Sequence, residues 1–236
     1  MAAGGVRRAR RGAGLKIRSV EFAGALAQPG APSPRGVKQV AFLGRSNVGK
    51  SSLINRLLGR TRTQLARVSA RPGKTREINF YRVRAELGRR EEVEFLLADL
   101  PGYGYARVPA EVKRRWRPLI EGYLRGSGEL VGVVHLLDAR HEPTADDRRM
   151  VRYLADLGVP TIFVMTKVDK LPRGRRAHQL ERAVAELGVD ESQVVAFSAK
   201  TGEGRDLLLG ALEDLLRAER AGAGREAASR GVGGAR

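Results

Sequence analysis

Continuous apolar runs alternate with amphipathic stretches along this chain of 236 residues. The runs lie at 40–43, 95–98, 130–137, 161–165 and 194–197, and their lack of regular alternation is typical of strands covered on both faces. The segments 78–87 and 92–99 are joined through Gly88, Arg89 and Arg90, a connection short enough to predict a hairpin. A first short strand is expected at 16–22, before a loop rich in proline and glycine at 29–36.

Helical patterns separate these strands. They cover residues 109–125, 145–157, 175–187 and 204–220, and another helix begins near residue 50 and continues through Leu53, Ile54, Leu57 and Leu58. No internal repeat is visible. Strands and helices in this order predict an α/β domain with a parallel sheet and crossover helices.

The ends of the chain differ from its middle. Residues 1–15 are basic and residues 221–236 contain little besides Ala, Gly, Arg and Ser, so both are expected to be disordered tails around one domain at 16–220. The N-terminal stretch has no apolar region of the secretory type. An organellar transit peptide is the alternative, but the stretch lacks serine and a clear amphipathic period.

Composition limits the partners. The formal net charge is +18, from 44 basic and 26 acidic residues, and favours a polyanionic partner such as nucleic acid. An ordinary solvated surface decorated with arginine is the competing interpretation. Since the chain has no cysteine, disulfides, Cys-ligated zinc and thiol catalysis are excluded. No apolar stretch is long enough to span a bilayer, so a cytoplasmic protein without membrane contact is expected.

Residues 44–51 read Gly-Arg-Ser-Asn-Val-Gly-Lys-Ser, a complete G-x-x-x-x-G-K-[ST] phosphate loop directly after an apolar strand. Gly44 and Gly49 allow backbone N–H groups to turn inward around phosphates. Lys50 can reach the β- and γ-phosphates, and the Ser51 hydroxyl can coordinate Mg²⁺. The following helix directs its positive N-terminal end at the same anion. This segment predicts binding of a nucleoside triphosphate.

A second motif, Asp99-Leu100-Pro101-Gly102, ends the apolar strand 95–98. A carboxylate at the C-terminal end of this strand would lie beside the phosphate loop, where it can hold Mg²⁺ through water. Gly102 can offer its backbone N–H to a γ-phosphate without steric hindrance. A Pro-Gly turn capped by an aspartate is the purely structural alternative.

A third motif, Thr166-Lys167-Val168-Asp169, follows the apolar strand 161–165. The Asp169 carboxylate can accept from both N1–H and the exocyclic amine of guanine, a bidentate contact that adenine cannot match. Lys167 can lay its aliphatic stem over the purine. A backbone N–H of Ser198-Ala199-Lys200, after the strand 194–197, would contact guanine O6. We therefore expect a guanine nucleotide.

These motifs together resemble the TRAFAC-class GTPases, and within them the EngB (YihA/YsxC) family of ribosome-biogenesis GTP-binding proteins. The resemblance covers residues 18–217. It rests on five segments: 44–55, Arg-Pro-Gly-Lys-Thr at 71–75 followed by Asn79, Phe80 and Tyr81, 99–106, 166–169 and 197–200. The most family-specific piece is Gly-Tyr-Gly-Tyr at 102–105. It implies a three-layer P-loop GTPase fold of the α/β class, with a six-stranded, mostly parallel sheet, one antiparallel strand and helices on both faces.

The resemblance also implies a function and a set of ligands. The function is a GTPase switch that assists assembly of the large ribosomal subunit and is needed for cell division and septation. The implied partners are the rRNA and ribosomal proteins of the subunit precursor, and the protein is expected to be a monomer. The implied ligands are GTP or GDP with Mg²⁺. Metal ligands would be Ser51, Thr75 and Asp99, with Thr75 as the first-switch threonine, and the catalytic groups would be Lys50, Thr75 and Gly102.

The expected nucleotide contacts fall in four segments. They are Gly44, Arg45, Ser46, Asn47, Val48, Gly49, Lys50, Ser51 and Ser52; Gly73, Lys74, Thr75, Arg76 and Glu77; Asp99, Leu100, Pro101 and Gly102; and Thr166, Lys167, Val168, Asp169, Phe197, Ser198, Ala199 and Lys200. Thr166 stands where the wider superfamily has asparagine. Its hydroxyl can still tie the base pocket to the phosphate loop.

The sequence has no evident residue that orients the attacking water for hydrolysis. Ras-like enzymes orient the attacking water with a glutamine after the switch glycine, whereas this chain has Tyr103, so hydrolysis without a partner should be slow. His135 lies within an apolar strand and is interpreted as a core residue. Where glutamine and an arginine finger are both lacking, some GTPases of this superfamily use a monovalent cation beside the phosphates. A K⁺ ion near Asn47 is therefore a hypothesis, against a plain turn role for Asn47.

Two functions of other classes stay open at this point. One is an ATP-dependent P-loop enzyme, disfavoured because the strand-end acid belongs to Asp-x-x-Gly and because Asp169 fits guanine. The other is an RNA-binding protein that keeps a nucleotide as a structural ligand with little turnover, against which stand the intact Lys50, Ser51, Thr75 and Asp99.

Overall fold

The computed structural model describes residues 14–60, 77–88, 91–103 and 110–218, with only the backbone described for 110–116. The strands are β1 (Lys16–Leu26), β2 (Gln39–Gly44), β3 (Ile78–Leu87), β4 (Glu91–Asp99), β5 (Leu130–Asp138), β6 (Thr161–Thr166) and β7 (Val194–Phe197). The helices are α1 (Lys50–Leu57), α2 (Ala110–Gly126), α3 (Ala145–Asp156), α4 (Arg173–Leu187) and α5 (Arg205–Arg217), with short 3₁₀ turns η1 (Val168–Lys170) and η2 (Glu191–Gln193). The predicted alternation of strands and helices is confirmed.

The strands form one sheet in the order β1-β3-β4-β2-β5-β6-β7. β3 runs antiparallel to both of its neighbours, whereas β4, β2, β5, β6 and β7 are mutually parallel. The fold class and the single antiparallel strand are as predicted. Adjacent pairing of Leu87 with Glu91 bears out the hairpin between β3 and β4.

The predicted number of six strands is wrong, because the described part of the chain has seven in this sheet. The segment that begins at Lys16 continues to Leu26 and pairs with β3 along its whole length. Most of its side chains are exposed, and two register shifts interrupt the pairing. An edge strand held by its backbone in this way has little hydrophobic pattern to reveal its extent.

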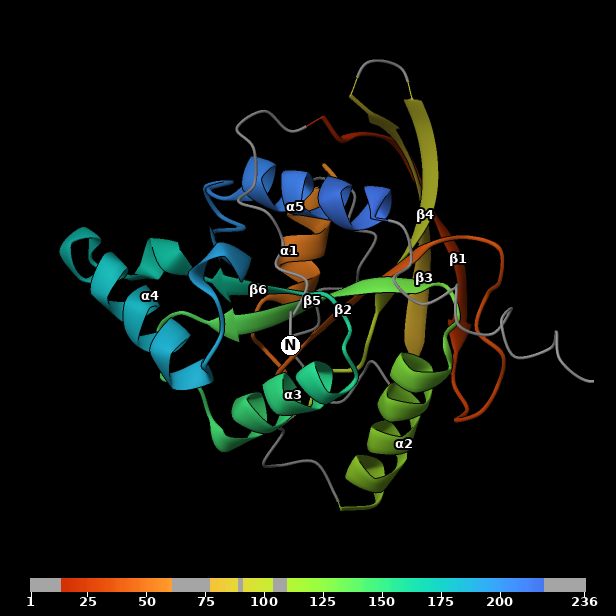
Figure 1. Ribbon diagram of the computed structural model, residues 1–236, viewed down its shortest axis with the longest axis horizontal. Coiled ribbons are helices and arrows are strands. Elements are labelled where there is room, and N and C mark those ends of the chain that lie inside the picture. Colours follow the sequence, from red (N-terminus) through yellow and green to blue (C-terminus); the bar gives the residue numbers. More distant parts are fainter. Residues whose placement is uncertain (1–13, 61–76, 89–90, 104–109, 219–236) are drawn as a thin grey trace, which may run out of the picture.

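Helices cover both faces of the sheet (Figure 1). On one face α1 and α5 pack together over the strands, through residues such as Leu53, Leu57 and Leu212. On the other face α2 and α3 contribute Leu119 and Leu154, and α4 joins the edge of this layer. Parallel strands covered on both faces are buried throughout, as the continuous apolar runs indicated.

The predicted boundary of the N-terminal tail needs correction. Leu15 is only 1% exposed and belongs to the core beneath α1 and α5, and the Gly14 carbonyl accepts a hydrogen bond from Gly88 N–H. Ordered structure therefore begins before residue 16. One leucine between Gly14 and Lys16 carries no periodic signal, so sequence alone could not find it. The remaining tail residues, 1–13 and 219–236, lie outside the described residues.

The sheet places the functional segments at one end. The carboxyl ends of five parallel strands, at Gly44, Asp99, Asp138, Thr166 and Phe197, all face the same edge of the sheet. In open α/β sheets this is the edge where ligands bind. Among the described residues, no helix combines the length and apolar character needed to cross a membrane.

Candidate functional site

The phosphate loop connects β2 to α1, as its sequence predicted. Asn47 and Gly49 have positive φ angles of 64° and 103°, which turn the backbone tightly before the helix. α1 begins at Lys50 with no acidic residue in its first turn and no side chain capping it. Its first N–H groups are thus left for an anion, which is the arrangement that binds phosphate in such loops.

Lys50 and Asp99 form a buried ion pair beside this loop. The Lys50 amine donates to Asp99 Oδ1, and the two side chains are 10% and 5% exposed. Burial lowers the pKa of Lys50 to about 7. The pair joins the two charges that were predicted to hold phosphates and Mg²⁺, so both groups lie at one point of the sheet edge.

A magnesium site fits the donors that are present. Ser51 follows Lys50 at the start of α1 and offers a hydroxyl oxygen. The Asp99 carboxylate contacts the Lys50 amine and so lies close to the same turn. No group of three or more acidic or histidine side chains converges within the described ranges. An ion held by Ser51 and Asp99 would therefore take further oxygen ligands from the nucleotide and water, as Mg²⁺ does in such sites.

The segment after β4 lies directly on the phosphate loop. Ser46 N–H donates to the Tyr103 carbonyl at 3.1 Å, and Tyr103 N–H donates to the Gly44 carbonyl at 3.2 Å. A side chain at Gly102 would place its Cβ 2.9 Å from Ser46 Oγ. A side chain would therefore force Ser46 to move, and glycine at 102 allows the segment after β4 to lie directly against the phosphate loop.

The Tyr103 side chain enters a buried polar network. Its hydroxyl donates to Asp147 Oδ1 of α3 at 2.9 Å and contacts His135 Nε2 of β5. The other oxygen of Asp147 accepts from the Thr144 N–H and hydroxyl, at 2.8 and 2.7 Å, and so caps α3. With its hydroxyl held by these partners, Tyr103 is not available to orient an attacking water.

The protonation states in this network follow from burial. Desolvation lowers the pKa of His135 to about 4, although the nearby Asp147 charge opposes the shift. Desolvation, together with Asp147, raises the pKa of Tyr103 well above its usual value. His135 is therefore neutral at pH 7, and its interpretation as a core residue agrees with its full burial in β5.

The two segments predicted to read the base, 166–169 and 198–200, meet at the phosphate loop near the ends of β6 and β7. Thr166 Oγ1 lies 2.6 Å from the Val48 carbonyl and 3.0 Å from the Leu137 carbonyl. The Lys167 amine donates to the Asn47 carbonyl at 2.6 Å. Ser198 Oγ donates to Asp169 Oδ1 at 2.7 Å. The structure thus brings the third motif, the phosphate loop and the segment after β7 into one site.

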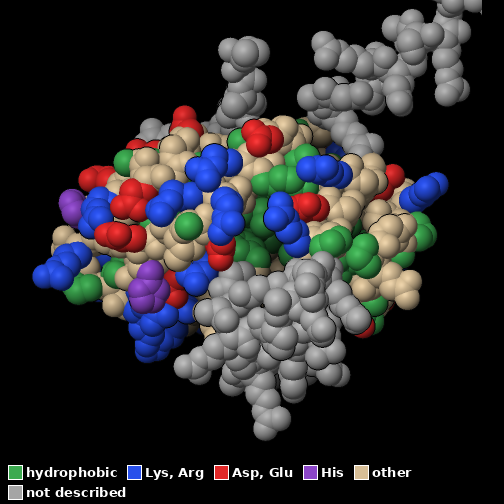
Figure 2. All heavy atoms as spheres, turned by 90° about the horizontal axis from the view of Figure 1, so that it is seen from below, with side chains coloured by type: hydrophobic (Ala, Val, Ile, Leu, Met, Phe, Trp, Pro, Cys, Tyr) green, Lys and Arg blue, Asp and Glu red, His purple; other side chains and the backbone are tan. Residues whose placement is uncertain are grey.

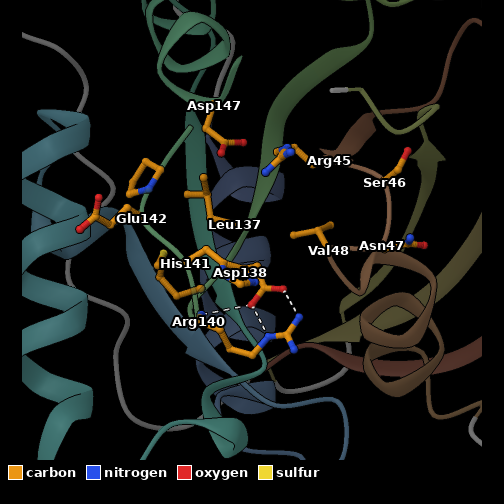
Figure 3. A pocket seen from close by; sticks show the side chains of 12 residues that line it. Arg45, Ser46, Asn47, Val48, Leu137, Asp138, Arg140, His141, Glu142 and Asp147 are labelled. Atoms are coloured by element: carbon orange, nitrogen blue, oxygen red, sulfur yellow. Dashed lines mark hydrogen bonds and ion pairs between the residues drawn. The ribbon is translucent and has the colours of Figure 1, made fainter. Parts of the chain in front are cut away.

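These residues line a pocket of about 480 Å³ between α1 and the ends of β6 and β7. Its lining includes Gly49, Ser52, Thr166, Lys167, Asp169, Phe197, Ala199 and Lys200, all of them predicted nucleotide contacts. The size suits a small ligand. A smaller pocket of about 220 Å³ lies beyond the phosphate loop and includes Arg45, Asn47, Asp138, Arg140 and Asp147 (Figure 3).

Several residues of the site were not foreseen. Arg56 of α1 donates to the carbonyls of Ala199 and Lys200 at 2.6 and 2.7 Å, and so holds the loop after β7. Arg205 of α5 donates to the carbonyls of Arg56 and Leu57 at the end of α1. Neither arginine differs in sequence from a surface residue. Asp138 and Asp147 were also missed, although an acid at the end of the apolar run 130–137 was a usable signal for Asp138.

Other predicted contacts remain without a structural test. Gly73, Lys74, Thr75 and Arg76 lie outside the described residues. Glu77 is exposed just before β3, two residues from Asn79, which pairs with Asp99. Glu77 therefore lies toward the same end of the sheet as Asp99. The roles assigned to individual residues in binding, metal coordination and hydrolysis stay predictions.

Known proteins match this chain over most of its length. The family described as "50S ribosome-binding GTPase" matches residues 39–167, and the elongation factor Tu GTP binding domain matches residues 121–218. The "Probable GTP-binding protein EngB" of Gemmatimonas aurantiaca is 52% identical over 203 residues, 86% of this chain and 95% of that protein. The chain belongs to the EngB family. The protein of the same name from Desulforamulus reducens is 44% identical over the same shares of the two chains.

Membership in the EngB family makes the chain a GTPase that binds GTP and GDP, and it removes the ATP-dependent alternative. A crystal structure of a probable GTP-binding protein engB has a TM-score of 0.57 and 26% sequence identity, and covers 76% of this chain and 98% of that chain. The structure of Era with MgGDPNP and nucleotides of 16S ribosomal RNA has a TM-score of 0.61 at 23% identity, a likeness of fold alone. It covers 76% of this chain and 56% of that one.

Proposed function

We propose that this EngB-family GTPase is a nucleotide-controlled assembly factor for the large ribosomal subunit in the cytoplasm, needed for normal cell division and septation. The observation that carries the proposal is the match of residues 39–167 to a family described as binding the 50S ribosome. The net charge of +18 is compatible with a partner made largely of RNA. The protein would act as a monomer, which sedimentation in its free form tests.

The direct test is cosedimentation with large-subunit precursors. Binding in the presence of a GTP analogue should exceed binding with GDP, because the γ-phosphate supplies the contacts that order the switches. Equal binding in the two states would remove nucleotide control. No binding in either state would remove the ribosomal role.

The switch itself has a separate test. Asp99, Gly102 and Thr75 should be ordered around Mg²⁺ with GTP and loosened with GDP, because only GTP places a γ-phosphate beside them. Hydrogen exchange across residues 66–78 and 99–108 reports on this. The same protection with both nucleotides would contradict a switch and leave a nucleotide-stabilised protein.

Contact with ribosomal RNA should depend steeply on salt. On the face in Figure 2, Lys and Arg side chains are interspersed with Asp and Glu, so part of the charge there is locally balanced. From the sequence, the predicted contributors are Arg7, Arg8, Arg10 and Arg11 with the cluster Lys113, Arg114 and Arg115. Each lost phosphate contact should flatten the log–log salt slope by about 0.7 to 0.9. An unchanged slope after neutralising all seven would make them ordinary surface residues.

Hydrolysis is proposed to use a K⁺ ion beside the phosphates, with Asn47 as one ligand. The support is the engaged hydroxyl of Tyr103, which leaves the position of the missing glutamine without a water-orienting group. A cation there would neutralise charge that develops between the β- and γ-phosphates. Turnover in K⁺ against Na⁺ at equal ionic strength, for wild type and Asn47→Ala with ribosomal subunits present, tests the idea. Rates in wild type that do not depend on the cation would overturn it.

A further inference from the structure

Asp138 stands at a point that no predicted motif included. It ends β5, where it pairs with Thr166 across the neighbouring strand β6. Its side chain is 16% exposed and projects beside the phosphate loop, on the pocket that Figure 3 shows. Asp138 is thus a carboxylate at the carboxyl end of a central strand, between the loop that meets phosphates and the segment that meets the base.

Asp138 accepts hydrogen bonds from two cations. Arg140 approaches with Nε at 2.9 Å from Oδ1 and Nη2 at 2.8 Å from Oδ2, a bidentate contact (Figure 3). The Lys167 amine donates to Oδ2 at 2.8 Å. Burial would raise the pKa of Asp138, but the bonds from Arg140 and Lys167 outweigh it and lower the pKa to about 2. The carboxylate is therefore charged at any pH at which the protein would be used.

Lys167 is held at two points by these contacts. Its amine lies between Asp138 Oδ2 and the Asn47 carbonyl. Its backbone has a positive φ of 61°, and a side chain at Gly49 would place its Cβ 3.6 Å from Lys167 Cε. The stem of the lysine therefore runs along the wall of the 480 Å³ pocket from a fixed end. A lysine side chain is otherwise flexible, so the fixed end determines where the stem lies.

We propose that Asp138, itself oriented by Arg140, is a positioning residue that fixes the Lys167 stem against the purine and thereby sets the residence time of guanine nucleotides. In this role Asp138 would contact Lys167 and neither base nor phosphate. Its contribution acts through the lysine and is the same for every purine that stacks on that stem. The proposal rests on GTP binding by this family and does not depend on the ribosomal role.

The test measures release of a fluorescent GDP analogue from the isolated protein. Asp138→Asn should release it roughly tenfold faster, since one hydrogen bond between charged groups is lost. Arg140→Ala keeps the contact to Lys167 and should speed release only about threefold, as expected for a half-exposed ion pair. Asp156→Asn, an equal charge change on an exposed side chain at the end of α3, is the matched control and should leave release unchanged. Unchanged release in Asp138→Asn overturns the proposal.

A double-mutant cycle separates positioning from a structural role. In a Lys167→Met background, Asp138→Asn should give no further acceleration, because its only route to the nucleotide is gone. The ratio of GDP to IDP affinity should also stay unchanged in Asp138→Asn, since Asp169 alone is predicted to read the 2-amino group that IDP lacks. The same tenfold acceleration in both backgrounds, or a changed ratio, would show that Asp138 acts by another route. If Asp138→Asn fails to fold, Arg140→Ala is compared in the wild-type and Lys167→Met backgrounds instead. Its acceleration of release should then disappear in the Lys167→Met background.

Discussion

The base pocket and the phosphate side of the site are built differently. In the base pocket, Thr166 and Lys167 bond to backbone carbonyls, and Ser198 orients Asp169, so the side chains predicted to form the guanine site already have fixed positions. On the phosphate side, Lys50 and Asp99 bond to each other. A nucleotide can enter the first region without exchanging contacts, but it must replace an ion pair in the second.

This difference assigns separate tasks to the two regions. A preorganised pocket loses little entropy on binding, which favours selectivity for the base. If Lys50 binds phosphate and Asp99 binds Mg²⁺ as predicted, their ion pair must first separate, so metal and phosphates are expected to bind together.

Lys50→Met should destabilise the nucleotide-free protein by about 4 kcal/mol. The substitution leaves the Asp99 carboxylate buried without a cation, and breaking one partner of such a pair typically costs about 3 to 5 kcal/mol. Urea denaturation of the free protein measures the free energy of unfolding. The double variant Lys50→Met/Asp99→Asn should recover most of the loss, and equal instability of the single and double variants would contradict the ion-pair account.

Asp169→Asn should weaken GTP binding by about 1 to 3 kcal/mol and shift preference toward xanthine nucleotides, because an amide replaces the accepting carboxylate. Ser198 should still orient the side chain, so the loss reports on base recognition rather than on a collapsed pocket. Competition between GTP and XTP measures it. Asp190→Asn, which changes the same residue type at the cap of η2, is the control. GTP binding as tight as in wild type would make the assignment of Asp169 wrong.

The buried His135 should make the free energy of unfolding depend on pH. Its pKa is about 4 in the folded protein and near 6.5 in an unfolded chain, so the unfolded state takes up the proton first as pH falls. This contribution is absent above pH 7 and should reach about 2 kcal/mol of lost stability by pH 5. His135→Gln keeps an N–H near Tyr103 but does not titrate. Comparing the urea midpoints of the two proteins at pH 7.5 and pH 5 isolates the effect, and identical pH dependence would refute it.

Thr166→Val should weaken GTP and GDP equally, by about 1 kcal/mol. The change removes one hydroxyl that ties β6 to the phosphate loop and leaves the shape of the side chain almost unchanged. Thr166→Ser keeps the hydroxyl and should bind nearly as well as wild type. A loss confined to GTP would place Thr166 in the switch rather than in the base pocket.

The sequence predicted the base pocket better than it predicted the phosphate side. Motifs such as Thr166 to Asp169 follow apolar strands, and the order of parallel strands brings their carboxyl ends together regardless of detail. The sequence likewise placed Asp99 and Lys50 correctly, at the carboxyl ends of the parallel strands. Their mutual pairing was not predictable, because it depends on side-chain contacts that no spacing encodes.

Residues that act at a distance were the ones missed. Arg56 reaches a loop 143 residues further along the chain, and Asp147 reaches Tyr103 from α3. In sequence both are polar positions on amphipathic helices, indistinguishable from residues that face solvent. The extent of β1 escaped for a related reason, since an edge strand that is held by its backbone needs no apolar pattern.

The packing of α5 on α1 has a consequence for the order of events during synthesis. The helix that carries Lys50 and Ser51 emerges early, yet its last carbonyls are bonded by Arg205, and Arg56 within it bonds the loop after β7. A nascent chain that has not yet exposed α5 lacks both connections. The phosphate-loop helix therefore lacks these connections until α5 has left the ribosomal tunnel, and nucleotide bound before that moment is expected to be held less firmly than in the folded protein.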